Sequence, residues 1–285
     1  MKLSKREVCI FNNEIMITIK KGNIFTTTCQ TIVNTVNCVG VMGAGIAYEC
    51  RLRYPKMYER YRELCRERKL NIGLLWLYRP EVLNEKWILN FPTKNHWKYE
   101  SKEEYLEKGL QKFLDTYKEK GITSIAFPLL GASNGGIPES VSLKIMTKYL
   151  EKCDEIEIEI YHFDPYAYDD KYLEFKRLWN EIPESELKKE LKIIKDRENR
   201  ELQLKLKELI GDGEVKNRKE IEKISEKLKE KIISVSVIRK ALDDDRIRSL
   251  SGLLRAKGVG DKTLEKAFHF INNYRRNEQD ALFIE

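Results

Sequence analysis

Two glycine-rich loops in the first half of this chain carry the residue types of an anion-binding site. The first, residues 32–47, reads IVNTVNCVGVMGAGIA, with Asn34 and Asn37 at the exit of an apolar strand pattern. The second, residues 128–137, reads PLLGASNGGI and also runs from a strand pattern into a helix pattern. Glycine lets the backbone approach a ligand closely, and N–H groups at a helix start attract phosphate. Together with the amides, which suit a sugar, the loops predict a nucleotide-diphosphate site. The alternative is that they are only tight turns.

A third segment, residues 90–97, reads NFPTKNHW and places Lys94 and His96 just after another strand pattern. A lysine near the anomeric carbon of a sugar could protonate a leaving group or attack a ring-opened aldehyde. The neighbourhood of the two loops offers no pair of carboxylates suited to acid–base hydrolysis. Lys94 is therefore the leading candidate for catalysis, although a solvated surface charge is the plainer interpretation.

Several other site types are excluded or weakened. The chain has neither a Walker motif nor a dinucleotide fingerprint with its acidic partner, which argues against kinases and dehydrogenases. Its six cysteines form no C-x-x-C pair and it has only three histidines, so we expect no metal site and no disulfide framework. We expect reduced, buried thiols and no cofactor.

Strand and helix patterns alternate over residues 1–180 and must position these loops. We expect strands at 15–20, 31–34, 74–78, 87–91, 124–127 and 157–163, and helices at 45–53, 55–68, 101–120 and 139–152. This alternation predicts a three-layer α/β/α domain with a mixed sheet. Both glycine loops then fall at carboxyl ends of strands, where such sheets bind ligands.

The composition changes near residue 181. Glu, Lys, Leu and Ile dominate residues 181–231, which we expect to be a charged arm of two amphipathic helices broken at 211–213. Residues 232–285 are expected to form a smaller all-α domain. Residues 231–276 hold 11 basic and 5 acidic side chains, which favours a polyanionic partner. With no apolar run of the ~18 residues that a membrane span needs, we expect no membrane contact and a cytoplasmic location.

The strings KGNI, IVNTVNCVGVMGAGIA, NFPTKNHW and PLLGASNGGI, in this order, resemble the macrodomain family. The likeness covers about residues 12–165, and its VNTVNCVGVMG and NFPTK-x-HW strings are similar to the DarG-type DNA ADP-ribosyl glycohydrolases. The resemblance implies ADP-ribose as the ligand and Lys94 and Asn37 as catalytic residues, with Asn37 at the distal ribose. It also implies that the adenine-binding aspartate of the family is replaced here by Asn23, an amide without the charge.

The same resemblance implies a set of ADP-ribose contacts. They are Asn23 and Ile24 after the first strand, Asn34, then Val41, Met42, Gly43, Ala44, Gly45 and Ile46 of the first loop, Thr93 and His96 of the third segment, and Gly131, Ala132, Ser133, Asn134, Gly135, Gly136 and Ile137 of the second loop.

Near the C-terminus, SGLLRAKGVGDKTLEKAF at 251–268 resembles a helix–hairpin–helix motif. Glycine amides and a helix start would meet a phosphate there, with basic side chains adding charge. The expected nucleic-acid contacts are Arg255, Lys257, Gly258, Gly260, Lys262 and Lys266. The alternative is a hairpin that docks on another protein.

The expected function is removal of ADP-ribose from a macromolecule, with a base in single-stranded DNA as the leading substrate. By resemblance, the protein would be the antitoxin of a DNA ADP-ribosyltransferase toxin. The rival hypotheses are an ADP-ribose-binding module without catalysis, an antitoxin that sequesters its toxin through residues 181–285, and a deacylase of O-acetyl-ADP-ribose.

Overall fold

The structure is a computed structural model that describes residues 8–12, 15–82, 85–210, 218–229, 232, 234–254 and 256–282. The chain divides into two compact units. The first comprises residues 1–171 with 248–252, and the second comprises 172–247 with 253–285. Within the described residues, no helix is both long and apolar enough to cross a bilayer.

The described strands of the first unit form one mixed sheet in the order β1-β2-β7-β6-β3-β5-β4. These strands are β1 (Val8–Asn12), β2 (Ile15–Gly22), β3 (Thr31–Asn37), β4 (Trp76–Tyr78), β5 (Trp87–Lys94), β6 (Ser124–Pro128) and β7 (Glu157–Phe163). The inner strands β2, β7, β6, β3 and β5 run parallel, whereas β1 and β4 pair antiparallel at the two edges. The mixed sheet expected from the sequence is confirmed.

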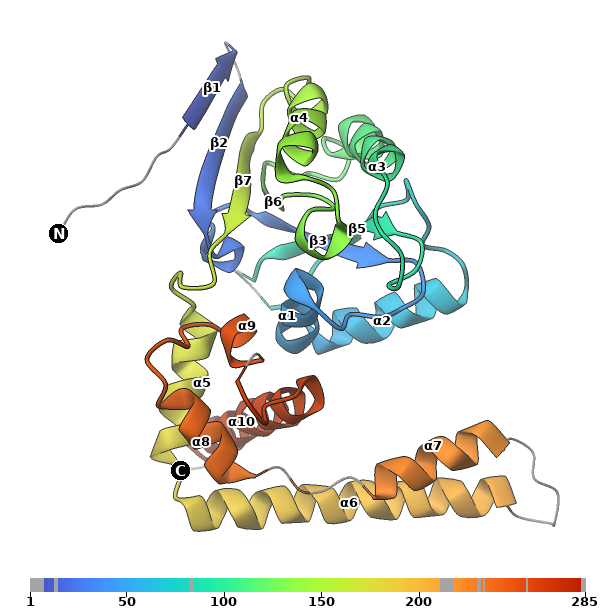
Figure 1. The fold of residues 1–285 in the computed structure, drawn as a ribbon, viewed down its shortest axis with the longest axis vertical. Coiled ribbons are helices and arrows are strands. Elements are labelled where there is room, and N and C mark those ends of the chain that lie inside the picture. The colour runs from blue at the N-terminus through green and yellow to red at the C-terminus, as the bar shows by residue number, and fades with distance from the viewer. Residues whose placement is uncertain are drawn as a thin grey trace. The chain divides into compact units, whose positions relative to one another are not determined.

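Helices cover both faces of this sheet. Helices α3 (Glu103–Thr116) and α4 (Glu139–Leu150) pack on one face, and α1 (Gly45–Arg53) and α2 (Pro55–Arg66) pack on the other (Figure 1). Alternating strand residues feed the two cores: Val33 belongs to the α3/α4 side, whereas Ile32 and Val36 belong to the α1/α2 side. Both faces of the sheet are therefore buried, which gives the three-layer architecture.

The first unit contains one strand that the sequence did not predict, β1 at Val8–Asn12. It lies outside β2 as an antiparallel edge strand. The helix expected at 101–120 is shorter, because α3 begins at Glu103 and ends at Thr116. The helix expected at 55–68 ends at Arg66, where Arg68 takes a positive φ of 56°. The remaining expected strands and helices of this unit are confirmed, with ends shifted by up to three residues.

Helices are the only regular secondary structure in the described residues of the second unit. It contains most of α5 (Asp170–Glu181), then α6 (Glu184–Ile210), α7 (Arg218–Leu228), α8 (Val235–Leu242) and α10 (Asp261–Leu282), whereas α9 (Leu250–Leu253) belongs mostly to the first unit. Stacked aromatic rings join its ends, with Phe175 5.6 Å from Trp179 and 6.0 Å from Phe268 between ring centroids. The two charged helices of residues 181–231 are confirmed, and the expected break at 211–213 lies outside the described residues.

Candidate functional site

Parallel strands bring two predicted catalytic residues together at one edge of the sheet. Asn37 ends β3, Lys94 ends β5, and the register of the two strands pairs Asn37 with Lys94. The register shifts between Val36 and Asn37, because Thr93 of β5 is an extra residue without a paired position on β3. The Cys38 amide then donates to the Lys94 carbonyl at 3.1 Å, which fixes the start of the first loop against the end of β5.

The Asn37 side chain holds the first loop in shape. Its Nδ2 donates to the Val41 carbonyl at 2.6 Å, and its Oδ1 accepts from the amides of Val39 at 3.0 Å and Val41 at 3.3 Å. Tyr61 of α2 donates its hydroxyl to the Asn37 carbonyl at 2.6 Å. Asn37 is only 7% exposed. The Asn37 amide therefore holds the loop through its hydrogen bonds to the Val39 and Val41 backbone. A ribose contact by Asn37 would have to be compatible with these bonds.

Lys94 joins the second glycine loop to the first. Its ammonium donates to the Asn134 carbonyl at 2.5 Å. On the other side, a Cβ built on Gly45 would lie 3.0 Å from Asn134 Nδ2, so the two glycine loops approach each other at this point. Gly45 also has a φ of +55°, which favours glycine. The lysine, the asparagine that ends β3 and both loops thus form one site.

The start of helix α1 is suited to an anion. Its N-cap is Ala44, which supplies no side-chain hydrogen bond, and its first turn has no acidic residue. The first N–H groups of a helix have no intrahelical partner and carry partial positive charge. The chain around them is exposed at Val41, Gly43, Ala44 and Gly45 and half-buried at Ile46, whereas Met42 is buried beneath. This end of α1 can accept phosphate oxygens.

The second loop is built on backbone geometry that few residues adopt. Gly131, Ser133 and Gly136 have φ values of +65°, +48° and +82°. Ser133, Asn134 and Gly136 are exposed, whereas Gly131, Ala132, Gly135 and Ile137 are buried. The Ser101 amide donates to the Gly135 carbonyl at 2.8 Å and anchors the loop from beneath. The loop is thus anchored at Gly135 and exposed at Ser133, Asn134 and Gly136.

The predicted adenine contact lies at the end of β2. Asn23 is buried and is the N-cap of a short 3-10 turn, Ile24–Thr26, where its Oδ1 accepts from the Phe25 amide at 3.0 Å. Ile24 is also buried, in the core on the α1/α2 side. Asn23 can offer the remaining donors of its amide nitrogen to a base, without the charge of an aspartate.

Three other predicted contacts differ in their surroundings. Asn34 is fully buried, and its Nδ2 donates to Asn90 Oδ1 at 2.9 Å, which ties β3 to β5. Thr93 is buried near the end of β5. His96 is half-buried and its ring stacks on Trp97 at 5.5 Å between centroids. Of these residues, Asn34 has a structural role in the sheet, because its bond to Asn90 links β3 and β5 whether or not a ligand is bound.

Sequence reasoning missed two residues that the structure places at this site. Tyr61 holds the end of β3 from α2, and burial raises the pKa of its hydroxyl, which keeps it protonated as a donor. Glu100 lies against the second loop, where a Cβ built on Gly136 would be 3.2 Å from its carboxyl carbon. No local sequence signal marks either residue, because both reach the site through long-range packing.

Cys38 follows Asn37 directly, and Cys29 lies before β3 beside two glutamates. Burial raises the pKa of the Cys38 thiol to about 11, so that it stays protonated at neutral pH. Among the described residues, Cys29, Glu157 and Glu159 cluster within 4.8 Å. Burial raises the pKa of Cys29 to about 11, and Glu159 is bonded to Lys20, Thr27 and Tyr161. Internal bonds therefore account for this cluster. The described free cysteines are buried, except for half-buried Cys38.

The predicted nucleic-acid contacts of the hairpin belong to the second unit. Lys257, Gly258, Gly260 and Lys262 are exposed, and Gly258 has a φ of +86°. Lys266 forms an ion pair with Glu198 at 3.2 Å. Arg255 lies outside the described residues. Asp261 stands in the first turn of α10, where a carboxylate complements the helix dipole.

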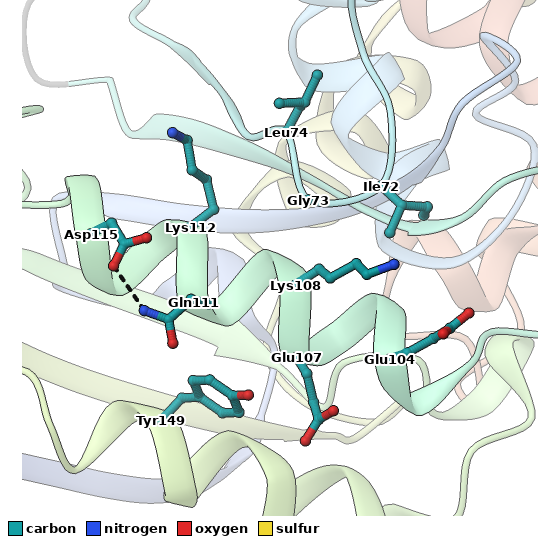
Figure 2. A pocket seen from close by; sticks show the side chains of 10 residues that line it. All are labelled: Ile72, Gly73, Leu74, Glu104, Glu107, Lys108, Gln111, Lys112, Asp115 and Tyr149. Atoms are coloured by element: carbon teal, nitrogen blue, oxygen red, sulfur yellow. Dashed lines mark hydrogen bonds between the residues drawn. The ribbon is translucent and has the colours of Figure 1, made fainter.

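A separate groove of about 510 Å³ lies along the outer face of α3 (Figure 2). It is lined by Ile72, Gly73, Leu74, Glu104, Glu107, Lys108, Gln111, Lys112, Asp115 and Tyr149, none of which is a predicted site residue. Its charged side chains spread outward from the helix, and the Gln111 amide bonds Asp115 at 2.8 Å. The groove offers no concentration of one charge and no catalytic grouping.

Comparisons with known proteins agree with this geometry. The family model of the Macro domain matches residues 33–146. The DNA ADP-ribosyl glycohydrolase of Thermus aquaticus is 36% identical over 147 residues, which are 51% of this chain and 41% of that protein. A DNA ADP-ribosyl transferase–DNA ADP-ribosyl glycohydrolase fusion protein of Thermosipho africanus is 33% identical over 175 residues, 56% of this chain and 44% of that protein. The chain thus spans about two fifths of the length of these curated relatives.

Two solved structures extend the comparison. The macrodomain of Mycobacterium tuberculosis DarG matches with a TM-score of 0.50 and 36% identity, and the match covers 51% of this chain and 97% of that one. Thermosipho africanus DarTG in complex with ADP-ribose matches with a TM-score of 0.51 and 33% identity, over 56% of this chain and 43% of that one. With its glycine loops, its Lys94 strand and its sheet order in place, this chain belongs to the macrodomain family and carries a macrodomain of the DarG type.

Proposed function

We propose that this protein is an ADP-ribosyl glycohydrolase that removes ADP-ribose from a base of single-stranded DNA. The observation that carries the proposal is the position of Lys94, paired in register with Asn37 and bonded to the Asn134 carbonyl. The relatives named as DNA ADP-ribosyl glycohydrolases support the substrate. The diphosphate would bind at the start of α1 and at the second loop, and Asn23 would face the adenine.

Lys94 would act at the anomeric carbon of the distal ribose. As an ammonium it would donate a proton to the departing base while water attacks the anomeric carbon. As an amine it would displace the base and form an imine with the opened sugar, and water would then hydrolyse this imine to free ADP-ribose. Both routes give the same products, ADP-ribose and the unmodified base. Only the second route leaves an adduct that borohydride can trap.

The test uses a single-stranded oligonucleotide with one ADP-ribosylated base. The intact protein should release ADP-ribose, and Lys94→Ala should lower the rate at least ~100-fold, as removal of a positioned acid or base does. Lys112→Ala, on the groove outside the site, is the matched control and should keep full turnover. No release by the intact protein, or undiminished release by Lys94→Ala, would refute the proposal.

A second candidate function is an ADP-ribose-binding module without catalysis. It is favoured by the bond between Lys94 and Asn134, since a lysine in this bond can act as a tether between loops. ADP-ribose binding by calorimetry with no release from the oligonucleotide would support this alternative. Weaker binding by Lys94→Ala would be its further signature.

We also propose two partners. The fusion protein of Thermosipho africanus joins a transferase to a glycohydrolase in one chain, which suggests a DNA ADP-ribosyl transferase toxin as the partner here, in the cytoplasm. The exposed Lys257 and Lys262 of the hairpin would hold nucleic acid without sequence preference. If so, Lys257→Ala/Lys262→Ala should weaken binding of unmodified DNA and reduce its salt dependence.

A further inference from the structure

The segment that follows Lys94 exposes a cluster of aromatic rings. Trp97 is 49% exposed and Tyr99 is 68% exposed. The His96 ring lies between them, 5.5 Å from each ring between centroids, with an interplanar angle of 28° to Trp97 and 50° to Tyr99. We call these three residues the aromatic platform. Large aromatic side chains exposed together are unusual unless something binds them.

The aromatic platform is held rigidly beside the candidate site. At its start, the Cys38 amide donates to the carbonyls of Lys94 at 3.1 Å and Asn95 at 3.3 Å. At its end, the Ser101 amide donates to the Gly135 carbonyl of the second glycine loop at 2.8 Å. Both ends are therefore fixed to the loops that form the site. A backbone held at both ends loses less conformational freedom when a ligand binds, which lowers the entropic cost of binding.

Cationic side chains accompany the rings. Lys98 places its ammonium 5.3 Å from the centre of the Trp97 ring, and Lys102 lies 5.7 Å from the Tyr105 ring. The carboxylates that follow in the sequence have other contacts than these rings. Glu100 lies against Gly136, whereas Glu103 and Glu104 stand in the first turn of α3, where they complement the helix dipole. Exposed rings interleaved with lysines are typical of surfaces that stack single-stranded bases and contact their phosphates.

We infer that the aromatic platform binds single-stranded nucleic acid on the side of the modified nucleotide, by stacking its unmodified neighbouring bases on Trp97 and Tyr99. The inference rests on the proposed function, because it assumes that the ADP-ribosylated base at Lys94 belongs to a single strand of DNA. Because the aromatic platform follows Lys94 closely in the chain, we favour a DNA strand over a protein as its partner. Residues 95–100 follow Lys94 directly, so they are within reach of a nucleotide next to the one on which Lys94 would act.

The experiment compares two substrates that carry the same ADP-ribosylated base, a single-stranded oligonucleotide and a single nucleoside. Trp97→Ala and Tyr99→Ala should each lower kcat/KM on the oligonucleotide roughly 5- to 150-fold, because stacking is worth about 1–3 kcal/mol per base. The loss should lie mainly in KM. The nucleoside should be turned over within about twofold of the unaltered protein, since it has no neighbouring base to stack.

Controls separate stacking from folding. Trp97→Phe and Tyr99→Phe keep a ring and should restore most of the oligonucleotide activity. Tyr149→Ala removes another ring flanked by lysines, in the groove of Figure 2, and should change neither substrate. Equal losses on both substrates, or no loss on either, would overturn the inference.

A failure of the proposed function leaves the inference testable. If the intact protein releases ADP-ribose from neither substrate, its affinity for unmodified oligothymidylate is measured by fluorescence anisotropy. All the proteins compared in this measurement also carry Lys257→Ala and Lys262→Ala, so that DNA binding by the hairpin is weakened equally in each of them. Trp97→Ala/Tyr99→Ala should then weaken binding at least ~5-fold, and unchanged affinity would refute the aromatic platform as a nucleic-acid surface.

Discussion

Substitution of Asn37 distinguishes a residue that shapes the site from one that only touches the ligand. In Asn37→Ala, the amides of Val39 and Val41 lose their acceptor and the Val41 carbonyl loses its donor. Each net hydrogen bond contributes about 0.5–1.5 kcal/mol, and water replaces part of this where the loop is exposed. We expect the free energy of unfolding to fall by about 2–3 kcal/mol. For a unit of this size, the melting temperature should fall by roughly 4–12 °C.

The same change should weaken ADP-ribose binding by more than ~10-fold, because the loop no longer holds the exposed turn before α1. Asn37→Asp is the sharper variant. It keeps an oxygen for Val39 and Val41 but replaces the amide donor with an oxygen facing the Val41 carbonyl. We expect it to lose binding as well, with a smaller loss of stability than alanine causes.

Calorimetric unfolding and ADP-ribose titration are the two measurements. Asn71→Ala is the control, because the exposed Asn71 holds one turn through a single bond to the Arg68 carbonyl at 2.9 Å. It should lower the melting temperature by only a few degrees and leave binding intact. If Asn37→Ala melted like the unaltered protein but no longer bound ADP-ribose, Asn37 would act on the ligand and not on the loop.

Three further predictions concern the frame of the site. Burial raises the pKa of Tyr61, so the folded state holds this proton more tightly than the unfolded chain, whose tyrosines titrate near pH ~10. The free energy of unfolding should therefore fall as the pH rises above about 10. Tyr61→Phe, measured by urea unfolding, should make this fall with pH shallower, and the same pH dependence in both proteins would contradict the raised pKa of Tyr61. Gly109→Ala places a methyl 2.2 Å from the Phe91 ring and should cost about 2–3 kcal/mol in thermal unfolding, whereas Gly121→Ala, at a φ of +65° in open space, should cost about 1 kcal/mol; equal costs would contradict the packing argument. Arg53→Met removes the guanidinium that lies 2.9 Å from the buried Asp169 carboxylate and should cost about 3–5 kcal/mol in denaturant unfolding, and a loss below ~1 kcal/mol would show that this ion pair contributes little to stability.

Much of the first unit could be predicted from local patterns. The helix of residues 45–53 and the strand of residues 157–163 have the expected bounds, because hydrophobic periodicity is a local signal. The edge strand β1 was missed although its pairing with β2 is local, with Asn12 opposite Ile15, because its short apolar run VCIF shows no alternation of apolar and polar residues. The contributions of Tyr61 and Glu100 were missed because their contacts with Asn37 and Gly136 join positions that are far apart in the sequence.

The two asparagines show how far residue type alone can lead. Asn34 and Asn37 lie three apart, and residues at odd spacing on a strand point to opposite faces. Asn34 has the parity of Ile32 and Val36, both of which pack in the core on the α1/α2 side. Its amide accordingly lies buried against Asn90.

Asn37 is the last residue of β3 and follows the register shift after Val36. Its Oδ1 accepts from the Tyr61 hydroxyl of α2 at 3.2 Å and from the backbone amides of Val39 and Val41 in the loop that follows. Strand parity alone would place Asn37 with Val33 on the α3/α4 side, whereas its side chain bonds Tyr61 of α2 after the register shift. That shift depends on pairing with β5, so the role of Asn37 in building the loop is visible only in the three-dimensional structure.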